Sequence, residues 1–318
     1  MSLAALNSPP LVALTGLGIG ANLSLIDQFA LTSPWNVVRI ANLVSYGINF
    51  MSVQRPGRLD GQASEGGELA PRSGKTLVAP AGWAFAIWGP IFLGEMVGVV
   101  APFFIKESAP VVEVLRQTSG PFIAAQIFQS LWCAAFRPKY KGWSMFVSTG
   151  FLSATAYSLS RAHAVFAANS DKYSNLEYGI FFLPMALHFG WTSAASLVNL
   201  NGSVSMQEGQ STKVIKYVGH LSVLAASALG IYLAKERNAP VYAGVIAWAL
   251  AAVADGMKKR LDSVDDSDKK KKKASVSVNL DGAKTQYLLS KTGSMINALG
   301  AAFVAGSMSA SSKAVPKF

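Results

Sequence analysis

The feature that most constrains this chain is a series of apolar runs long enough to cross a lipid bilayer. A run of about 18 or more apolar residues crosses the hydrocarbon core as a helix, because lipid offers no partners for unpaired backbone groups. Seven or eight such helices are expected, the last being the least apolar: Trp35 to Val53, Gly82 to Ile105, Phe122 to Phe136, Trp143 to Phe166, Tyr178 to Asn199, Tyr217 to Ala234, Val241 to Met257 and Tyr287 to Met308. The sequence therefore predicts an all-α integral membrane bundle.

The composition agrees with a membrane environment. Hydrophobic residues make up 51% of the chain and charged residues only 14%, against about a quarter in soluble domains. The net charge of +11 comes from basic residues in loops, above all Lys258 to Lys273, so membrane topology explains it and no nucleic-acid partner is expected. The single Cys133 excludes an intrachain disulfide, and the three separated histidines give no metal-ligand spacing.

The N-terminal segment is given no span of its own. Residues Met1 to Ala30 are mildly apolar and contain no lysine or arginine, so a cleaved targeting segment has little support. Within them, Leu11 to Ile26 is expected to form a half-buried helix that Gly16, Gly18 and Gly20 interrupt.

The third run, Phe122 to Phe136, is short for a bilayer-spanning helix. It is bracketed by Pro121 on one side and by Arg137, Lys139 and Lys141 on the other. Helix tilt or snorkelling of the basic side chains would make up the missing length.

Basic residues divide unevenly between the two sides of the expected bundle. The loops that follow odd-numbered runs carry eighteen Lys and Arg residues, and the opposite side carries eight. By the positive-inside rule, the first set faces cytoplasm, matrix or stroma and both termini face the other way. An intracellular or organellar membrane, plastid or mitochondrial, is the preferred location.

Two long connections stand out. The segment Asp262 to Asp281 has the blocked charge of a disordered linker, and the alternative is contact with anionic lipid, where juxtamembrane lysines gain ~1 kcal/mol each. The segment Gln54 to Val78 is rich in Gly, Pro and Glu and is either mobile or a lid.

Three stretches share an order and spacing of aromatic, amide and small residues. They lie in the second, third and fifth runs: Pro80, Trp83, Phe85 and Trp88; then Ala124, Gln126, Phe128, Trp132 and Phe136; then Phe182, Pro184, Trp191, Ala195, Ser196 and Asn199. This pattern resembles the TspO/MBR family of tryptophan-rich sensory and translocator proteins over roughly Trp35 to Asn201. The resemblance implies a five-helix membrane core with a cavity for tetrapyrroles, sterols or other flat apolar ligands.

The chain also departs from that pattern. The family's usual Pro-Pro or Trp-rich run is replaced by Ala79 to Gly82, and Gly89-Pro90 interrupts the second run. The chain looks like a larger, divergent relative with about three extra C-terminal helices. The expected organisation has five parts: 1–34, an N-terminal segment without assigned structure; 35–201, the TspO-like core; 202–257, two further transmembrane helices; 258–284, a charged flexible loop; and 285–318, a C-terminal helix and tail.

Polar residues inside the runs are candidates for a site, because they are expensive against lipid and should face the bundle. Gln126 and Gln129 share a face with Trp132 and would bond a neighbouring helix or contact a ligand. Glu95 lies deep in the second run, so its carboxyl must be protonated, paired or beside water. His188 more often bonds a neighbour, although axial coordination of a haem is conceivable.

A ligand site follows from these positions and from the resemblance. In the fifth run, Trp191 and Ala195 share a face, which allows either close helix packing or a flat slot. The expected ligand-binding residues are Trp83, Phe85, Trp88, Glu95, Gln126, Trp132, Trp191, Ala195 and Asn199. No catalytic or metal-binding residue is assigned.

Three functions are weighed. The leading one is a multi-pass membrane protein that binds a hydrophobic small molecule, tetrapyrrole- or sterol-like, for transport, sensing or scavenging. The alternatives are an accessory subunit of a larger membrane complex and a proton-coupled secondary transporter with Glu95 as proton carrier. No cofactor is required, although a porphyrin or other tetrapyrrole is a possible ligand. The expected partners are membrane lipids and the small molecule, with a homodimer or larger membrane complex left open. The sequence has no catalytic motif, although some family members are associated with light-dependent tetrapyrrole breakdown.

Overall fold

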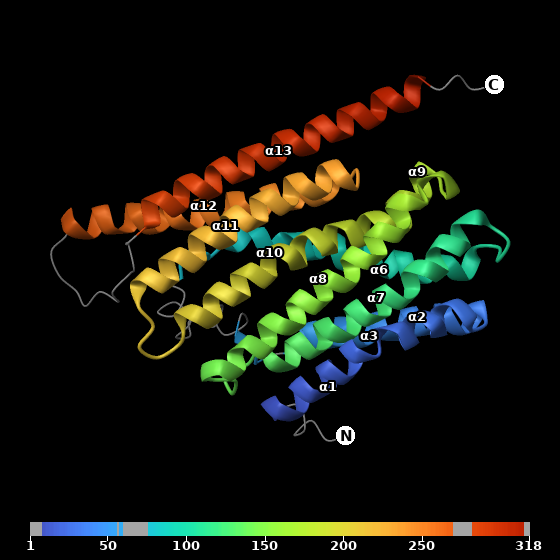
Figure 1. Cartoon of the computed structure of the whole chain (residues 1–318), viewed down its shortest axis with the longest axis horizontal. Helices are drawn as coiled ribbons and strands as arrows, with labels where there is room; N and C mark the ends of the chain where they lie inside the picture. The colour runs from blue at the N-terminus through green and yellow to red at the C-terminus, as the bar shows by residue number, and fades with distance from the viewer. Residues whose placement is uncertain (1–7, 56, 60–75, 270–281, 315–318) are drawn as a thin grey trace. The chain divides into compact units, whose positions relative to one another are not determined.

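The computed structural model describes residues 8–55, 57–59, 76–269 and 282–314, with side chains of 263–269 and 309–314 left out (Figure 1). The described chain is helical. Its α-helices are α1 (Pro9–Ala21), α2 (Leu23–Thr32), α3 (Trp35–Gln54), α6 (Trp88–Val100), α7 (Pro110–Ala135), α8 (Met145–Ala168), α9 (Asn175–Glu177), α10 (Leu183–Ser205), α11 (Thr212–Glu236), α12 (Pro240–Lys269) and α13 (Ala283–Ala314). Short turns of 3-10 helix, η2 (Gly82–Ile87), η3 (Ala101–Phe104), η4 (Gly142–Ser144) and η5 (Ser170–Lys172), and one π-helical turn, η6 (Tyr178–Phe182), join them.

Four helical stretches in the described chain are long and apolar enough to cross a membrane. They are Gly82–Phe104, Asn175–Ser205, Thr212–Glu236 and Pro240–Asp262. The pair α1 and α2, bent by 53°, passes the same test as one broken span, which would make five. Each expected run overlaps an α-helix, but α3, α7, α8 and α13 are not among the stretches that pass this test. The count of seven to eight spans therefore stays a prediction.

The N-terminal segment differs from its expected form. It holds two helices, and the break between them falls at Asn22 rather than at the glycines. Gly16 lies inside α1, where its missing side chain admits the ring of Phe151 from α8. Gly16 therefore serves helix packing, and Gly18 and Gly20 lie within α1 without breaking it.

Helix α7 is longer than its apolar run. It begins at Pro110, whose missing amide hydrogen has no intrahelical role in the first turn, and it includes Pro121 in its interior. Pro121 was expected to mark the helix start, which is wrong. One lost backbone bond is tolerated where neighbouring helices cover the site. Next to it, a Cβ on Gly120 would lie 2.6 Å from Asp27 Oδ1, so the glycine lets α2 approach.

Helix α12 extends beyond its expected end at Met257. It continues to Lys269, so the first residues of the expected linker Asp262 to Asp281 are helical. The remainder of that linker from 270, and positions 60–75 of the Gln54 to Val78 connection, lie outside the described residues.

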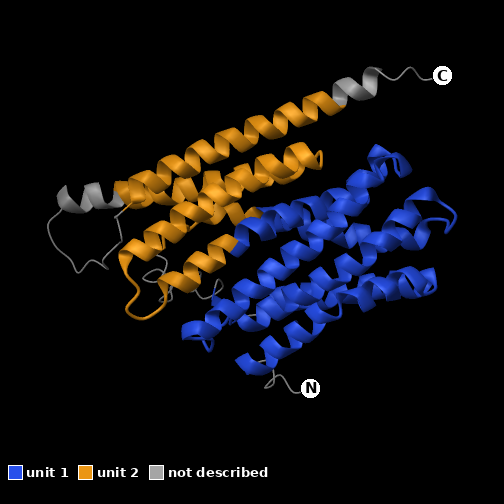
Figure 2. Ribbon diagram, in the orientation of Figure 1, with its two compact units in different colours: residues 1–66, 87–196 blue, residues 67–86, 197–318 orange. Residues whose placement is uncertain are grey.

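The chain forms two compact units (Figure 2). Unit 1 comprises residues 1–66 and 87–196, and in it α7 packs against α8, α3 and α2. Unit 2 comprises residues 67–86 and 197–318, and in it α11, α12 and α13 pack on one another. In the described residues, the chain passes from one unit to the other within η2 and within α10. The expected limits of the five-helix core stay a prediction.

Candidate functional site

A polar cluster lies in the interior of unit 1, on the buried face of α6. Ile91, Phe92, Glu95 and Val99 are buried at the spacing of one helix face, and Trp88 continues that face toward the helix start. Glu95 is thus held inside the unit by the same periodicity that buries its apolar neighbours. Its carboxyl must find partners there, because an unpaired charge at this depth is expensive.

The main partner of Glu95 comes from α10. His188 Nδ1 lies 2.6 Å from Glu95 Oε1, and the two side chains are 0% and 1% exposed. The ring of Trp88 stands edge-on to His188 at 5.6 Å and edge-on to Trp191 at 6.1 Å. His188 and Trp191 are three residues apart and so share a face of α10. The pair is therefore flanked by two indole rings.

Amide side chains extend the cluster across α7 to α3. Gln126 Nε2 donates to Glu95 Oε2 at 3.0 Å. Asn49 Nδ2 donates to Gln126 Oε1 at 2.5 Å and to Gln129 Oε1 at 2.8 Å. All three amides are buried, so helices α3, α6, α7 and α10 are joined by one hydrogen-bonded chain. Such a chain fixes helix register in a setting where lipid gives no apolar driving force.

Two glycines on α6 set the distance at which the start of α10 approaches. A Cβ on Gly94 would lie 2.5 Å from Pro184 Cγ, and one on Gly98 would lie 3.2 Å from the carbonyl oxygen of Ile180. Their four-residue spacing places both on one face of α6, as in the small-residue motifs of membrane helices. Ile180 belongs to η6, a π-helical turn of a kind found frequently at functional sites.

Several buried polar atoms of this cluster have no hydrogen-bond partner within the described part of the chain. They are His188 Nε2, Gln129 Nε2 and Asn49 Oδ1. A buried polar group without a partner costs about 1–3 kcal/mol. His188 Nε2 is the most informative of these atoms, since its ring is fully buried and its other nitrogen is bonded to Glu95.

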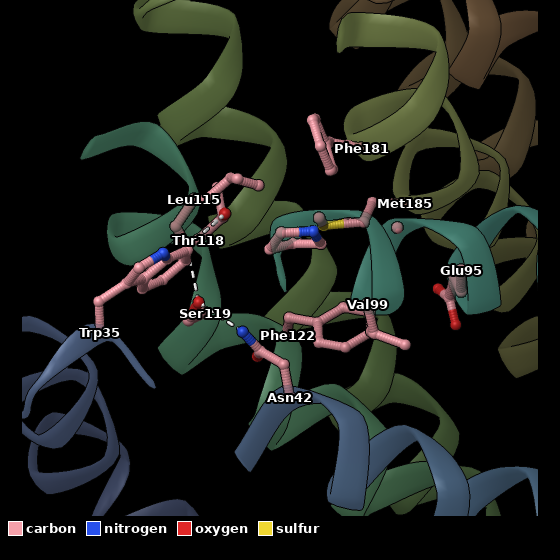
Figure 3. Close-up of a pocket in the computed structure, with 12 residues that line it drawn as sticks. Trp35, Asn42, Glu95, Val99, Leu115, Thr118, Ser119, Phe122, Phe181 and Met185 are labelled. Carbon is pink, nitrogen blue, oxygen red and sulfur yellow. Dashed lines mark hydrogen bonds between the residues drawn. The ribbon is translucent and has the colours of Figure 1, made fainter. Parts of the chain in front are cut away.

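A small cavity adjoins the other side of Glu95 (Figure 3). Its volume is about 30 Å³ and its wall combines apolar and polar side chains, namely Trp35, Asn42, Glu95, Gly98, Val99, Pro102, Leu115, Thr118, Ser119, Phe122, Phe181 and Met185. Asn42 Nδ2 donates to Ser119 Oγ at 2.8 Å, and Trp35 Nε1 is buried without a partner among the described residues. This volume suits one or two water molecules. A flat polycyclic ligand needs side chains to move.

The structure gathers some of the expected site residues and separates others. Trp88, Glu95, Gln126 and Trp191 come together as described. Trp132 lies in a neighbouring apolar cluster of unit 1, where Ala195 packs, and there it stacks on Phe136 at 5.3 Å. Arg58 covers its ring at 5.4 Å.

The remaining expected site residues fall in unit 2. Trp83 and Phe85 belong to the 3-10 turn η2 and are 40% and 44% exposed. Trp83 Nε1 donates to Asp255 Oδ2 at 3.0 Å, and its ring stands edge-on to Trp248 at 4.7 Å. Asn199 is buried. Their part in ligand binding stays a prediction.

Sequence reasoning missed Asn49, Gly94 and Gly98 as parts of this site. Asn49 is a buried amide in an apolar run, the same signal that singled out Gln126. The Gly94-x-x-x-Gly98 spacing was also readable. His188 bonds a neighbour, Glu95, through Nδ1. In the described residues, no group of three or more His, Cys, Asp or Glu side chains could hold a metal ion.

The helical architecture and the apolar helices define the class as a multi-pass integral membrane protein of helical-bundle type. A family model described as TSPO-like protein matches residues 37–264. The chain belongs to this family. The match runs from α3 into α12 and so extends beyond the stretch, ending near Asn201, on which the sequence resemblance rested. No curated protein and no solved structure matches the chain.

Proposed function

We propose that this protein binds a hydrophobic small molecule, tetrapyrrole- or sterol-like, within unit 1, for transport, sensing or scavenging. The observation that carries the proposal is a fully buried imidazole with an unpartnered nitrogen, His188 Nε2, placed beside Trp88 and Trp191. Small-molecule sites combine aromatic walls with few polar groups that fix orientation. The cluster around His188 has this composition.

Access to such a site requires side-chain movement. Trp88 is only half-buried, stacks on Phe92 at 5.2 Å and lies directly against His188. A rotation of its ring would uncover the imidazole without breaking the Glu95 hydrogen bonds. We therefore assign Trp88 the role of a movable wall and Trp191 that of a fixed wall, since Trp191 is 2% exposed.

The test is a titration of the purified protein with a panel of porphyrins and sterols, followed by quenching of tryptophan fluorescence. Saturable binding is expected, and Trp88→Phe and Trp191→Phe should each weaken it several-fold because stacking area is lost. Trp143→Phe is the matched control, since Trp143 is 73% exposed. Absence of saturable binding in the wild type would reject the proposal in favour of an accessory subunit, which should then co-purify in stoichiometric amounts with its complex.

A second candidate, proton-coupled transport, is favoured by one observation. Glu95 and His188 form a buried ionisable pair on two apolar spans, where ionisable residues commonly mark proton and substrate paths. Proton-dependent uptake into proteoliposomes that is lost in Glu95→Gln would support it. Uptake at the same rate with and without a pH gradient would contradict proton-coupled transport. An intracellular or organellar membrane remains the proposed location.

A further inference from the structure

We infer that the Glu95–His188 pair is the polar anchor of the ligand site and selects apolar molecules that carry a hydrogen-bond acceptor oxygen. This inference rests on the proposed function and specifies its ligand class. The observation behind it is the bonding of one imidazole: Nδ1 lies 2.6 Å from a carboxylate oxygen, and Nε2 is buried with no partner in the described chain.

The protonation of the pair determines what Nε2 offers. The pair has no net charge when it holds one proton in addition to the single N–H hydrogen of a neutral imidazole, that is, two exchangeable protons in all. If the proton is on Glu95, the carboxyl donates to Nδ1 and the hydrogen of the neutral imidazole is on Nε2. If the proton is on His188, both ring nitrogens carry hydrogens. In either form, Nε2 presents an N–H group.

Loss of that proton would make Nε2 an acceptor, but it would leave the pair with a net negative charge. Such a charge is expensive among apolar helices. The groups that face the pair do not neutralise it. Gln126 from α7 donates one neutral hydrogen bond to Glu95, and the Tyr46 hydroxyl of α3, which is near Glu95, donates to the carbonyl of Phe92 at 2.8 Å. Within the described residues, the ion-pair partner of Glu95 is His188 alone.

The site therefore has a donor without an acceptor. A ketone, hydroxyl, ester or carboxylate oxygen placed at Nε2 would satisfy this donor, whereas a pure hydrocarbon of the same shape would leave it unsatisfied. Each hydrogen bond to a buried, unsatisfied group changes affinity by about tenfold or more. The aromatic rings of Trp88 and Trp191 beside the imidazole favour flat ring systems.

The experiment uses two flat probes that differ in one oxygen, the three-ring ketone fluorenone and its hydrocarbon fluorene. Affinities are measured by titration calorimetry in micelles for the full-length wild type and for His188→Leu. The ratio of ketone to hydrocarbon affinity should fall about tenfold in the variant, because partition into micelles cancels in this double ratio. His220→Leu is the matched control, since the Nδ1 of His220 bonds Gln286 in unit 2.

Two further readouts keep the inference testable if His188→Leu does not fold. The infrared carbonyl band of fluorenone bound to the wild type should shift to lower frequency than in empty micelles. Glu95→Gln should retain that shift, because a glutamine amide can donate to Nδ1 while its oxygen accepts from Gln126. An unshifted band in a wild type that binds porphyrin or sterol would overturn the anchor and leave the proposed function standing. No saturable binding of any ligand would overturn both.

Discussion

The sharpest structural prediction concerns the energetic coupling between Glu95 and His188. Their side chains are 1% and 0% exposed and lie 2.6 Å apart, so removal of either leaves the other unsatisfied in the interior. The perturbation is a double-mutant cycle of Glu95→Leu, His188→Leu and the double variant. Leucine fills most of the volume of either side chain without adding a polar group.

The magnitudes follow from the hydrogen bonds that each change removes. Glu95→Leu removes the hydrogen-bond partner of both His188 Nδ1 and Gln126 Nε2 and should destabilise by ~4 kcal/mol, at ~1–3 kcal/mol for each unpartnered group. His188→Leu leaves one carboxyl oxygen unpaired and should cost ~3 kcal/mol. The double variant should cost no more than ~4 kcal/mol, since a buried pair replaced by apolar residues is often nearly neutral. The expected coupling free energy is therefore at least ~3 kcal/mol.

The assay is reversible unfolding in mixed micelles at increasing SDS fraction, followed by tryptophan fluorescence. The surface ion pair Arg116–Glu107 serves as the control cycle. Its side chains are 22% and 68% exposed, and its coupling should stay below ~1 kcal/mol. If the Glu95 and His188 costs simply add to within ~0.5 kcal/mol, the two side chains are not coupled and the site as described is refuted.

Three further predictions follow. Gly94→Ala should destabilise the protein by ~1–3 kcal/mol in the same assay, because the added Cβ would lie 2.5 Å from Pro184. Gly89→Ala on the same helix is the control: its Cβ would meet nothing within 4 Å, so this change should be neutral or stabilising. Equal effects of the two changes would contradict the close approach of α10. Trp83→Phe should lower the free energy of unfolding by less than ~1.5 kcal/mol, because the lost hydrogen bond joins exposed groups. A larger decrease would contradict this prediction. Burial raises the pKa of Tyr173 to about 12. The neutral hydroxyl therefore contributes its full stabilisation below about pH 10, the ordinary pKa of tyrosine. This contribution is lost as the pH rises through about 12. The free energy of unfolding of Tyr173→Phe, measured against alkaline pH, should lack this loss. A pH profile identical to that of the wild type would contradict the prediction.

The apolar runs predicted where most helices lie, because membrane burial leaves a strong signal in composition. They did not predict where α7 begins, since Arg116 and Pro121 look like loop residues. In the structure, Arg116 donates to the carbonyl of Ser33 and covers the ring of Trp35 at 5.2 Å, so the extra turns are held by packing against neighbouring segments. Tertiary contacts of this kind have no local sequence signature.

The candidate site was predictable in its parts and not in its assembly. Burial physics required a partner for Glu95 and an inward direction for Gln126, and both expectations match the structure. The identity of that partner, His188, depends on how α6 and α10 pack over a separation of 93 residues. Trp83 shares its motif with Trp88, yet the 3-10 turn η2 precedes α6 and the contacts of Trp83 lie in unit 2.

We propose that the ligand occupies unit 1 beside His188. The most direct measurement is photo-crosslinking with a diazirine-bearing sterol or porphyrin, followed by mapping of the labelled peptides by mass spectrometry. Adducts are expected on the segments 88–95 and 188–195, and excess unlabelled ligand should suppress them. Labelling confined to other helices, or labelling that competitor does not reduce, would contradict it.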